Sequence, residues 1–211
     1  FDQSLFGKGQ INEGKISVMT GLKALPSLAE HIRVQRDLSL LKYTGGSLHF
    51  TGISTKESVE LIAKAKKDGL AVTADCHVMN LVYTEEELLG FDSNMKVLPP
   101  LRTEVDRQAL ITGVSNGTID SICSNHQPEN IENKDVEFDL ADFGVIGTQT
   151  LFSLLNTLDE LSLEEKTEAI SSNPRAIFGL QNVEIKVGES ANLSLFDPFE
   201  EWTFESEDIL S

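Results

Sequence analysis

The chain has 211 residues, of which 40% are hydrophobic and 24% charged, a composition typical of a globular protein with one sizeable core. Its 34 acidic residues outnumber its 17 basic ones and give a formal charge of −17, which argues against nucleic acids and anionic membranes as partners, because both are bound through clustered Lys and Arg. No apolar run reaches the length of a membrane span, so we expect a soluble, cytoplasmic protein.

The first half of the chain alternates helical patterns with short apolar runs. Apolar residues recur at helical spacing over residues 26–38, and the pair Gly45-Gly46 ends that pattern. We predict a strand over 47–52, a helix over 54–69 that closes on basic residues and a glycine, and a buried strand over 70–76. Strand, helix and strand in succession predict parallel pairing.

The second half continues this alternation. The sequence predicts a helix over 104–114, a strand over 118–125, a long loop over 127–142, and helices over 144–155 and 162–171. The last of these helices opens on Ser162-Leu163-Glu164-Glu165, which has the pattern of a capping box.

The pattern changes near the C-terminus. Short alternating runs at 183–188, 191–197 and 201–204 are separated by Gly and Pro turns, which indicates β structure. We therefore divide the chain into an α/β unit, residues 1–181, and a small β unit, residues 182–211.

The two cysteines, Cys76 and Cys123, lie in apolar stretches without the paired spacing of a metal or redox motif, so we expect reduced thiols. Cys123 lies two residues before Asn125 and can share its face of a strand, but no nearby base supports a thiolate nucleophile. An inert buried thiol is therefore the favoured interpretation.

Eight short strings carry a resemblance to a known family. Their order is similar to that in dihydroorotases of the amidohydrolase superfamily, and the match that they mark covers essentially the whole chain. One such string is a weak signal, whereas eight in order indicate a real relationship. The strings begin at Asn12, Arg36, Tyr43, Ile53, Lys96, Asp142, Ser172 and Ala191, and read NEG, RD, YTGGSLH, ISTKESV, KVLPPLR, DFGVIG, SNPRAIFGL and ANLSLFDP.

The resemblance implies an α/β fold: the C-terminal part of a (β/α)8 TIM-type barrel, with a small β-sandwich appendage in residues 182–211 and active residues at the carboxyl ends of the strands. The family reaction is the reversible, zinc-assisted hydrolysis of the cyclic amide of dihydroorotate to N-carbamoyl-aspartate. That chemistry needs a bound water of lowered pKa and a carboxylate that takes its proton. The family's early zinc ligands would lie upstream of Phe1, so we expect a missing N-terminal half of the barrel.

Two positions that are essential in the family are substituted here. A zinc-ligating His is expected immediately before Ile53, where this chain has Gly52, which offers no side chain to a metal. The family's catalytic Asp falls on Asn125, which is neutral and can neither take a proton near neutral pH nor bind a cation strongly. The resemblance therefore implies a pseudoenzyme that holds no zinc of its own.

The substrate contacts of the family are only partly kept. Phe143 and Gly144, whose backbone contacts substrate in the family, are present. A substrate-binding Asn falls on Leu98, and a substrate-binding His falls on Glu129, which would turn a negative charge toward an anionic substrate. The last two positions are therefore read as degenerate.

Two histidines are alternative metal ligands. His49 lies on a predicted strand three residues before Gly52, and a packed or hydrogen-bonded histidine is favoured over a displaced ligand. His77 follows Asp75 and Cys76, but successive residues of a strand point to opposite faces, which disfavours a new site built from all three.

Three functional hypotheses follow. The leading one is a non-catalytic dihydroorotase-like protein of pyrimidine biosynthesis that acts as a structural partner, in a homodimer or with aspartate transcarbamoylase. The second is an active zinc-dependent dihydroorotase that acts on dihydroorotate and carbamoyl-aspartate through altered ligands. The third is a related cyclic amidohydrolase of the hydantoin or allantoin type.

Overall fold

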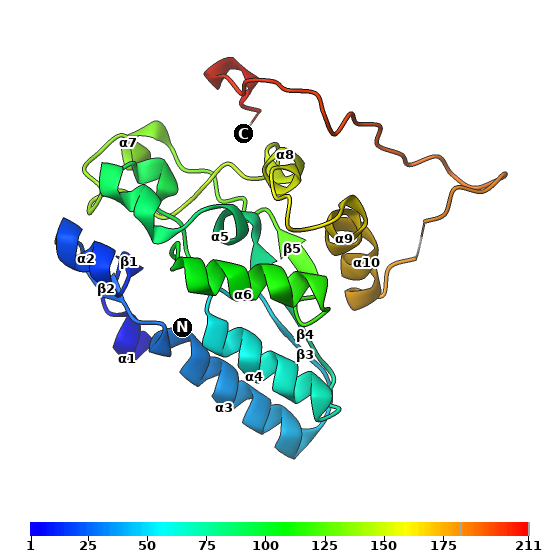
Figure 1. The fold of residues 1–211 in the computed structure, drawn as a ribbon, viewed down its shortest axis with the longest axis horizontal. Coiled ribbons are helices and arrows are strands. Elements are labelled where there is room, and N and C mark those ends of the chain that lie inside the picture. Colours follow the sequence, from blue (N-terminus) through cyan, green and yellow to red (C-terminus); the bar gives the residue numbers. More distant parts are fainter. Residues whose placement is uncertain (182, 211) are drawn as a thin grey trace.

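A three-stranded parallel sheet forms the centre of the computed structural model, which describes residues 1–181 and 183–210. Helices α3, α4 and α6 lie side by side along the sheet, and the run from α9 to α10 packs beside β5 (Figure 1). In chain order the elements are α1 (Gln3–Phe6), β1 (Ile11–Asn12), α2 (Lys15–Thr20), β2 (Ala24–Leu25), α3 (Leu28–Thr44), β3 (Leu48–Phe50), α4 (Lys56–Lys67), β4 (Val72–His77), α5 (Val78–Val82), η1 (Glu85–Gly90), η2 (Ser93–Met95), α6 (Glu104–Ser115), β5 (Ser121–Cys123), α7 (Ile131–Lys134), α8 (Leu151–Asn156), α9 (Leu163–Thr167), the π-helical η3 (Glu168–Ser172), α10 (Asn173–Ile177) and η4 (Ser206–Asp208).

Parallel pairing joins the central strands in the order β3-β4-β5. His49 lies opposite Thr73 between β3 and β4, and Cys76 lies opposite Ile122 between β4 and β5. A second, two-residue parallel pair joins β1 to β2. The parallel pairing predicted from the order of strands and helices is confirmed, and it brings the carboxyl ends of β3, β4 and β5 to one edge.

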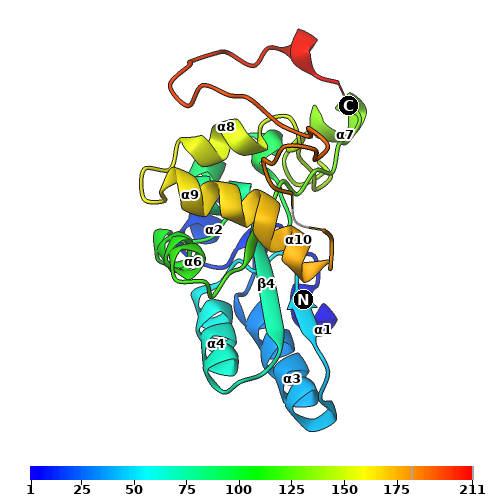
Figure 2. The ribbon, with the colours of Figure 1, turned by 90° about the vertical axis from the view of Figure 1, so that its right-hand side faces the viewer.

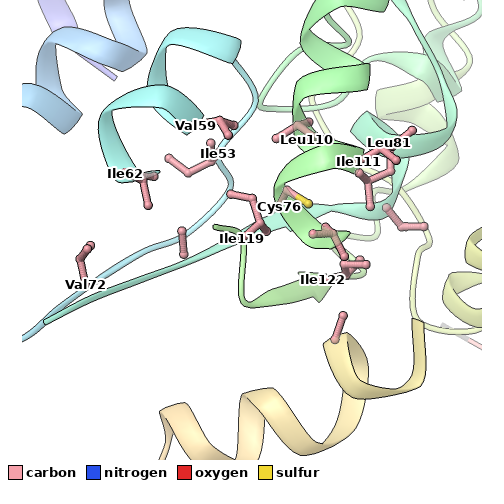
Figure 3. Close-up of a cluster of buried hydrophobic side chains, with 14 of the residues drawn as sticks. Ile53, Val59, Ile62, Val72, Cys76, Leu81, Leu110, Ile111, Ile119 and Ile122 are labelled. Carbon is pink, nitrogen blue, oxygen red and sulfur yellow. The ribbon is translucent and has the colours of Figure 1, made fainter. Parts of the chain in front are cut away.

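The main core lies between this sheet and helices α4 and α6. Ala74 and Cys76, at alternate positions of β4, are fully buried in it, and Figure 3 shows Cys76 among apolar side chains of α4, α6 and β5. Because side chains alternate along a strand, Thr73, Asp75 and His77 lie on the opposite face. That second face carries the candidate site.

Local capping fixes where several helices begin. The Thr55 hydroxyl accepts the N–H of Ser58 at the start of α4, at 3.3 Å. The predicted capping box before α9 is confirmed: the Glu165 N–H donates to the Ser162 hydroxyl, and the Ser162 N–H donates to the Glu165 carboxylate at 2.7 Å. Each such cap stabilises a helix by about 1 kcal/mol.

The helix predicted over 144–155 is wrong in its first half, because α8 begins only at Leu151. The preceding segment instead lies directly against residues 124–127. A Cβ on Gly144 would meet the Gln127 carbonyl oxygen at 2.4 Å, and one on Gly147 would meet the Ser124 carbonyl oxygen at 2.2 Å. Two glycines therefore allow a backbone-to-backbone contact that helical periodicity does not reveal.

Two further predicted boundaries need correction. The helix predicted to end at residue 171 continues through η3 into α10, which ends at Ile177, and Pro174 is accommodated at the start of α10 directly after the π-helical turn. The loop predicted over 127–142 contains the short helix α7.

The strands predicted over 183–188, 191–197 and 201–204 are not formed in the described part of the tail, residues 183–210; residues 182 and 211 of the predicted β unit lie outside the description. The tail leaves α10 and returns past α8 (Figures 1 and 2). It rests on α8 through the rings of Phe152 and Phe196, whose centroids are 4.4 Å apart, and through the Asn156 amide, which donates to the Pro198 carbonyl. A strand needs a neighbouring edge for its backbone hydrogen bonds, and the described residues place none beside this segment.

None of the helices in residues 1–181 and 183–210 combines the length and apolar composition that crossing a bilayer requires. The longest, α3, has 17 residues and carries charged side chains along its length.

Candidate functional site

Five residues meet at the carboxyl ends of the central strands, and we call them the strand-end site: Gly52, Asp75, His77, Leu98 and Asn125. Gly52 follows β3, Asp75 and His77 close β4, and Asn125 follows β5. Gly52, His77 and Leu98 line one cavity of about 410 Å³. The structure thus brings the two substituted positions of the sequence analysis, Gly52 and Asn125, to the same edge of the sheet.

Gly52 has a backbone conformation and a close neighbour that both favour glycine. Its φ of +69° lies in the left-handed region, which side chains rarely adopt. A Cβ built on Gly52 would stand 3.0 Å from Cε1 and 3.1 Å from Nε2 of His77. The His77 ring therefore occupies the space into which a side chain at position 52 would project.

Asp75 is the hydrogen-bonding centre of the site. It is 4% exposed, and its Oδ1 accepts the Gly52 N–H at 2.7 Å and the Thr51 hydroxyl at 3.2 Å. Its Oδ2 lies 3.0 Å from Nε2 of His49. Asp75 therefore ties the end of β3 to β4.

His49 lies on the face of the sheet that carries the candidate site and has hydrogen-bond partners at both ring nitrogens. Because the Asp75 carboxylate can only accept, Nε2 of His49 carries a proton. Nδ1 lies 2.8 Å from the Thr73 hydroxyl. Both ring nitrogens of His49 thus have polar partners.

Asn125 uses its amide as a donor. Its Nδ2 donates to the Leu98 carbonyl at 3.2 Å, and its φ of +52° is one that Asn tolerates better than most residues. An Asp at this position has no N–H and would turn a carboxylate oxygen toward the carbonyl oxygen. The amide is thus suited to a structural contact that the acid cannot make.

The residues of this edge do not fit a zinc ion by themselves. Structural and catalytic zinc sites take at least three ligands from Cys, His, Asp and Glu, and across residues 1–181 and 183–210 no group of three or more such side chains is placed to hold a metal. Asp75 and His49 are bound to each other. Burial, reinforced by Asp75, raises the pKa of Cys123 to about 12, so its thiol stays protonated near neutral pH.

The two cysteines are free thiols, as expected. Burial also raises the pKa of Cys76, which faces the main core on the other side of the sheet. This placement agrees with the alternation argument against a joint site of Asp75, Cys76 and His77.

Glu129 and Gly144 line a second pocket, which we call the loop pocket. This pocket has a volume of about 520 Å³, and Phe204 and Ile209 of the tail also line it. The Glu129 carboxylate accepts the Asn133 amide at 3.1 Å. The predicted substrate residues are therefore divided between two cavities, with Leu98 in one and Glu129 and Gly144 in the other.

Phe143 lies on a loop held by two lysines that sequence analysis did not identify. Nζ of Lys96 donates to the carbonyls of Phe138 and Ala141 at 2.7 and 2.6 Å, and it lies 5.3 Å from the centre of the Phe143 ring. Nζ of Lys134 donates to the Gly144 carbonyl at 3.0 Å. Burial lowers the pKa of both lysines.

A buried polar network supports the segment after Gly52. Oε1 of Glu30 accepts the N–H groups of Ser54 and Thr55 at 3.1 and 3.0 Å, and Ser54 accepts Nε of Arg102 at 3.1 Å. Arg102 also donates to Asn12 at 2.8 Å. Three strings of the resemblance, which begin at Asn12, Ile53 and Lys96, thus converge in one network.

Asp75 was the main residue that sequence reasoning undervalued. The alternation of Thr73, Asp75 and His77 along β4 was the available signal, since it places three polar side chains on one face of an otherwise apolar strand. Their partners on β3 and after β5 come from residues far along the chain, which periodicity cannot reveal.

Comparisons with known proteins give relatives along the whole chain. No family model matches. The dihydroorotase of Thermoanaerobacter sp. (strain X514) is 41% identical over 214 residues, which cover 100% of this chain and 49% of the relative. The dihydroorotase of Caldicellulosiruptor saccharolyticus is 44% identical over 214 residues, with 100% and 50% covered. The chain spans about half the length of the curated relatives it matches.

Solved structures give similar folds. The L-hydantoinase (dihydropyrimidinase) from Arthrobacter aurescens matches with a TM-score of 0.69 and 28% identity over 74% of this chain and 36% of that one. The inactive dihydroorotase-like domain of a Chaetomium thermophilum CAD-like multifunctional protein matches with a TM-score of 0.55 and 24% identity, over 69% and 41%. The second likeness concerns the fold alone.

Proposed function

Since this chain is homologous along its whole length to dihydroorotases of the amidohydrolase superfamily, we propose that it is a non-catalytic, dihydroorotase-like protein of pyrimidine biosynthesis. Its role is structural, as a homodimer or as a partner of aspartate transcarbamoylase. The observation that carries this proposal is the pair Gly52 and Asn125 at one edge of the sheet.

The chemistry of cyclic-amide hydrolysis explains why this pair matters. A metal-bound water becomes a nucleophile at neutral pH only when ligands hold the metal and a base takes the proton. Gly52 has no side chain, and the Asn125 amide donates to Leu98 rather than accepting a proton. Losing both a ligand and the base removes much of the transition-state stabilisation, on the order of several kcal/mol for each group.

The substrate contacts support the same proposal. Dihydroorotate and N-carbamoyl-aspartate carry carboxylates, which need cationic or amide partners. Leu98 supplies an apolar side chain, and Glu129 supplies a like charge in the separate loop pocket. Neither residue favours an anionic ligand.

One alternative is a cyclic-amide hydrolase of the hydantoin or allantoin type. The likeness to the Arthrobacter L-hydantoinase favours it, because hydantoins lack the carboxylate of dihydroorotate. It still needs a metal and a base, which the strand-end site does not supply from its own residues.

Turnover assays separate these functions. Purified protein, supplied with zinc, is incubated with dihydroorotate, N-carbamoyl-aspartate, hydantoin and allantoin. We expect no conversion of any of them, whereas an ordinary enzyme turns over roughly 1–10³ times per second. Conversion of dihydroorotate that is abolished by His49→Ala or His77→Ala would establish an active enzyme with altered ligands, and conversion of hydantoin alone would establish the alternative.

The partner role has its own test. Sedimentation of the purified protein, alone and mixed with aspartate transcarbamoylase from the same organism, should reveal a dimer or a mixed complex. A monomer that stays separate at micromolar concentration would contradict the structural role.

A further inference from the structure

The end of β4 supplies an imidazole at the position where β3 lacks a side chain. His77 is the last residue of β4, and its ring stands 3.0–3.1 Å from the point at which a Cβ of residue 52 would lie. Pro99 closes the other side, since its Cδ would be 3.5 Å from the same Cβ. The point that a Cβ of residue 52 would occupy is therefore already in close contact with His77 and Pro99, which border the same cavity.

His77 is packed as a neutral group. It is 8% exposed, and its Nδ1 is buried with no hydrogen-bond partner among residues 1–181 and 183–210. Burial lowers its pKa, and this effect outweighs the opposing influence of Asp75 and Glu30. A buried nitrogen without a partner costs stability, so packing of the ring, rather than hydrogen bonding, accounts for its position.

We propose that His77 is a plug that fills the space a ligand side chain at position 52 would enter, and that Asp75 ties the end of β3 to β4 in place of a metal ion. This inference rests on the proposed function and explains how the strand ends are held without a metal. Asp75 accepts from Gly52 and Thr51 after β3 and lies 3.0 Å from Nε2 of His49 on β3.

The position of the His77 ring also hinders the restoration of a metal-ligating histidine at position 52. A histidine restored at position 52 would start from a left-handed backbone and would compete with the His77 ring for the same space. We therefore infer that in the single variant Gly52→His the new imidazole cannot pack beside His77 and does not create a metal site.

A double-mutant cycle separates the steric effect of the His77 contact from the strain of a left-handed backbone. Gly52→Ala introduces both a left-handed alanine and a contact with His77, whereas Gly117→Ala introduces a left-handed alanine (φ +75°) with nothing within 4 Å of its Cβ. Urea unfolding is measured for each variant with and without His77→Ala. We expect Gly52→Ala to raise the unfolding equilibrium constant about tenfold more than Gly117→Ala, because overpacking adds to strain.

The coupling with His77 decides the outcome. In the His77→Ala background we expect most of the excess cost of Gly52→Ala to disappear, a coupling of about tenfold in the equilibrium constant, while Gly117→Ala and His77→Ala add independently. Equal costs for the two glycine variants, or additive effects at both positions, would overturn the plug. If Gly52→Ala does not fold, recovery of folding in Gly52→Ala/His77→Ala supports the plug, and failure to recover overturns it.

An exchange variant provides a second measurement. Gly52→His combined with His77→Gly moves the imidazole from one strand end to the other, and we expect it to be more stable than Gly52→His alone. A double variant no more stable than Gly52→His would contradict a shared volume. These stability measurements do not depend on turnover, so the two proposals can fail separately. An active protein in which Gly52 and His77 are coupled would overturn the proposed function but not the plug. An inactive protein without that coupling would overturn the plug but not the proposed function.

Discussion

At the scale of single residues, the proposed function depends on which hydrogen bonds the side chains of the strand-end site can donate and accept. Asn125 donates a hydrogen bond to the Leu98 carbonyl, and Asp75 accepts from Gly52 and Thr51 and lies beside Nε2 of His49. The family resemblance led us to expect that Gly52 and Asn125 stand at the ligand and base positions, and that expectation stays a prediction. The sequence could not reveal the His77 ring over Gly52, because that contact joins residues 25 positions apart whose spacing carries no signal.

Restoring the acid at position 125 should weaken the protein rather than activate it. Asn125→Asp replaces the donor to the Leu98 carbonyl with an oxygen, so we expect a loss of about 1–2 kcal/mol in the free energy of unfolding at neutral pH. Urea denaturation measures this loss, and Asn116→Asp, at the exposed end of α6, serves as a control. An Asn125→Asp variant more stable than the parent would contradict the assigned contact.

His77 should make stability depend on pH. Burial lowers its pKa from the ordinary value of 6.5, so the unfolded chain takes up a proton at a pH where the folded protein does not. This residue's contribution is therefore fully present above about pH 6.5 and is lost as the pH falls below it. Urea midpoints at pH 7.5 and 5.5 should differ less in His77→Gln than in the parent, and an unchanged difference would show that folding does not lower the pKa of His77.

At the scale of elements, the sequence separation of the contacting residues explains which elements the sequence predicted correctly and which it did not. Periodicity and capping located α3, α4, α6 and α9, because those signals lie within a few residues. The segment before α8 was mistaken for helix, because its glycines serve a contact with residues 124–127. The predicted strands of the tail lacked a neighbouring edge among the described residues.

That backbone contact can be tested at one glycine. Gly147→Ala would place a Cβ 2.2 Å from the Ser124 carbonyl oxygen, so the two segments must separate, and we expect a destabilisation of about 3 kcal/mol. Gly90→Ala is the matched control, because nothing lies within 4 Å of its Cβ and its φ is not left-handed. Thermal unfolding of the two variants compares them directly, and equal melting temperatures would refute the close approach.

Substitutions in the buried polar network that supports the segment after Gly52 should lower the free energy of unfolding more than the substitution at Gly147. Glu30→Ala leaves the Arg102 guanidinium, which is 2% exposed, without its nearest carboxylate, and we expect a loss of about 3–5 kcal/mol. Glu60→Ala removes an exposed partner of Lys56 and should cost less than about 1 kcal/mol. Similar unfolding midpoints for both variants would show that the Glu30–Arg102 pair does not support the site.

At the scale of the whole molecule, the alternation of strands and helices predicted the parallel sheet, and the eight strings predicted the relationship to dihydroorotases. The sequence did not predict that the expected substrate residues divide between two cavities, because their distribution depends on how the loop after β5 and the tail pack. The proposed function requires that the strand-end site take no metal and that the His77 ring pack over Gly52.

Anomalous X-ray diffraction at the zinc edge, from crystals grown with excess zinc, tests that claim most directly. We expect no anomalous peak beside Gly52, His77 and Asn125, and the His77 ring to remain over Gly52. A peak at that position with a complete coordination shell would contradict the account.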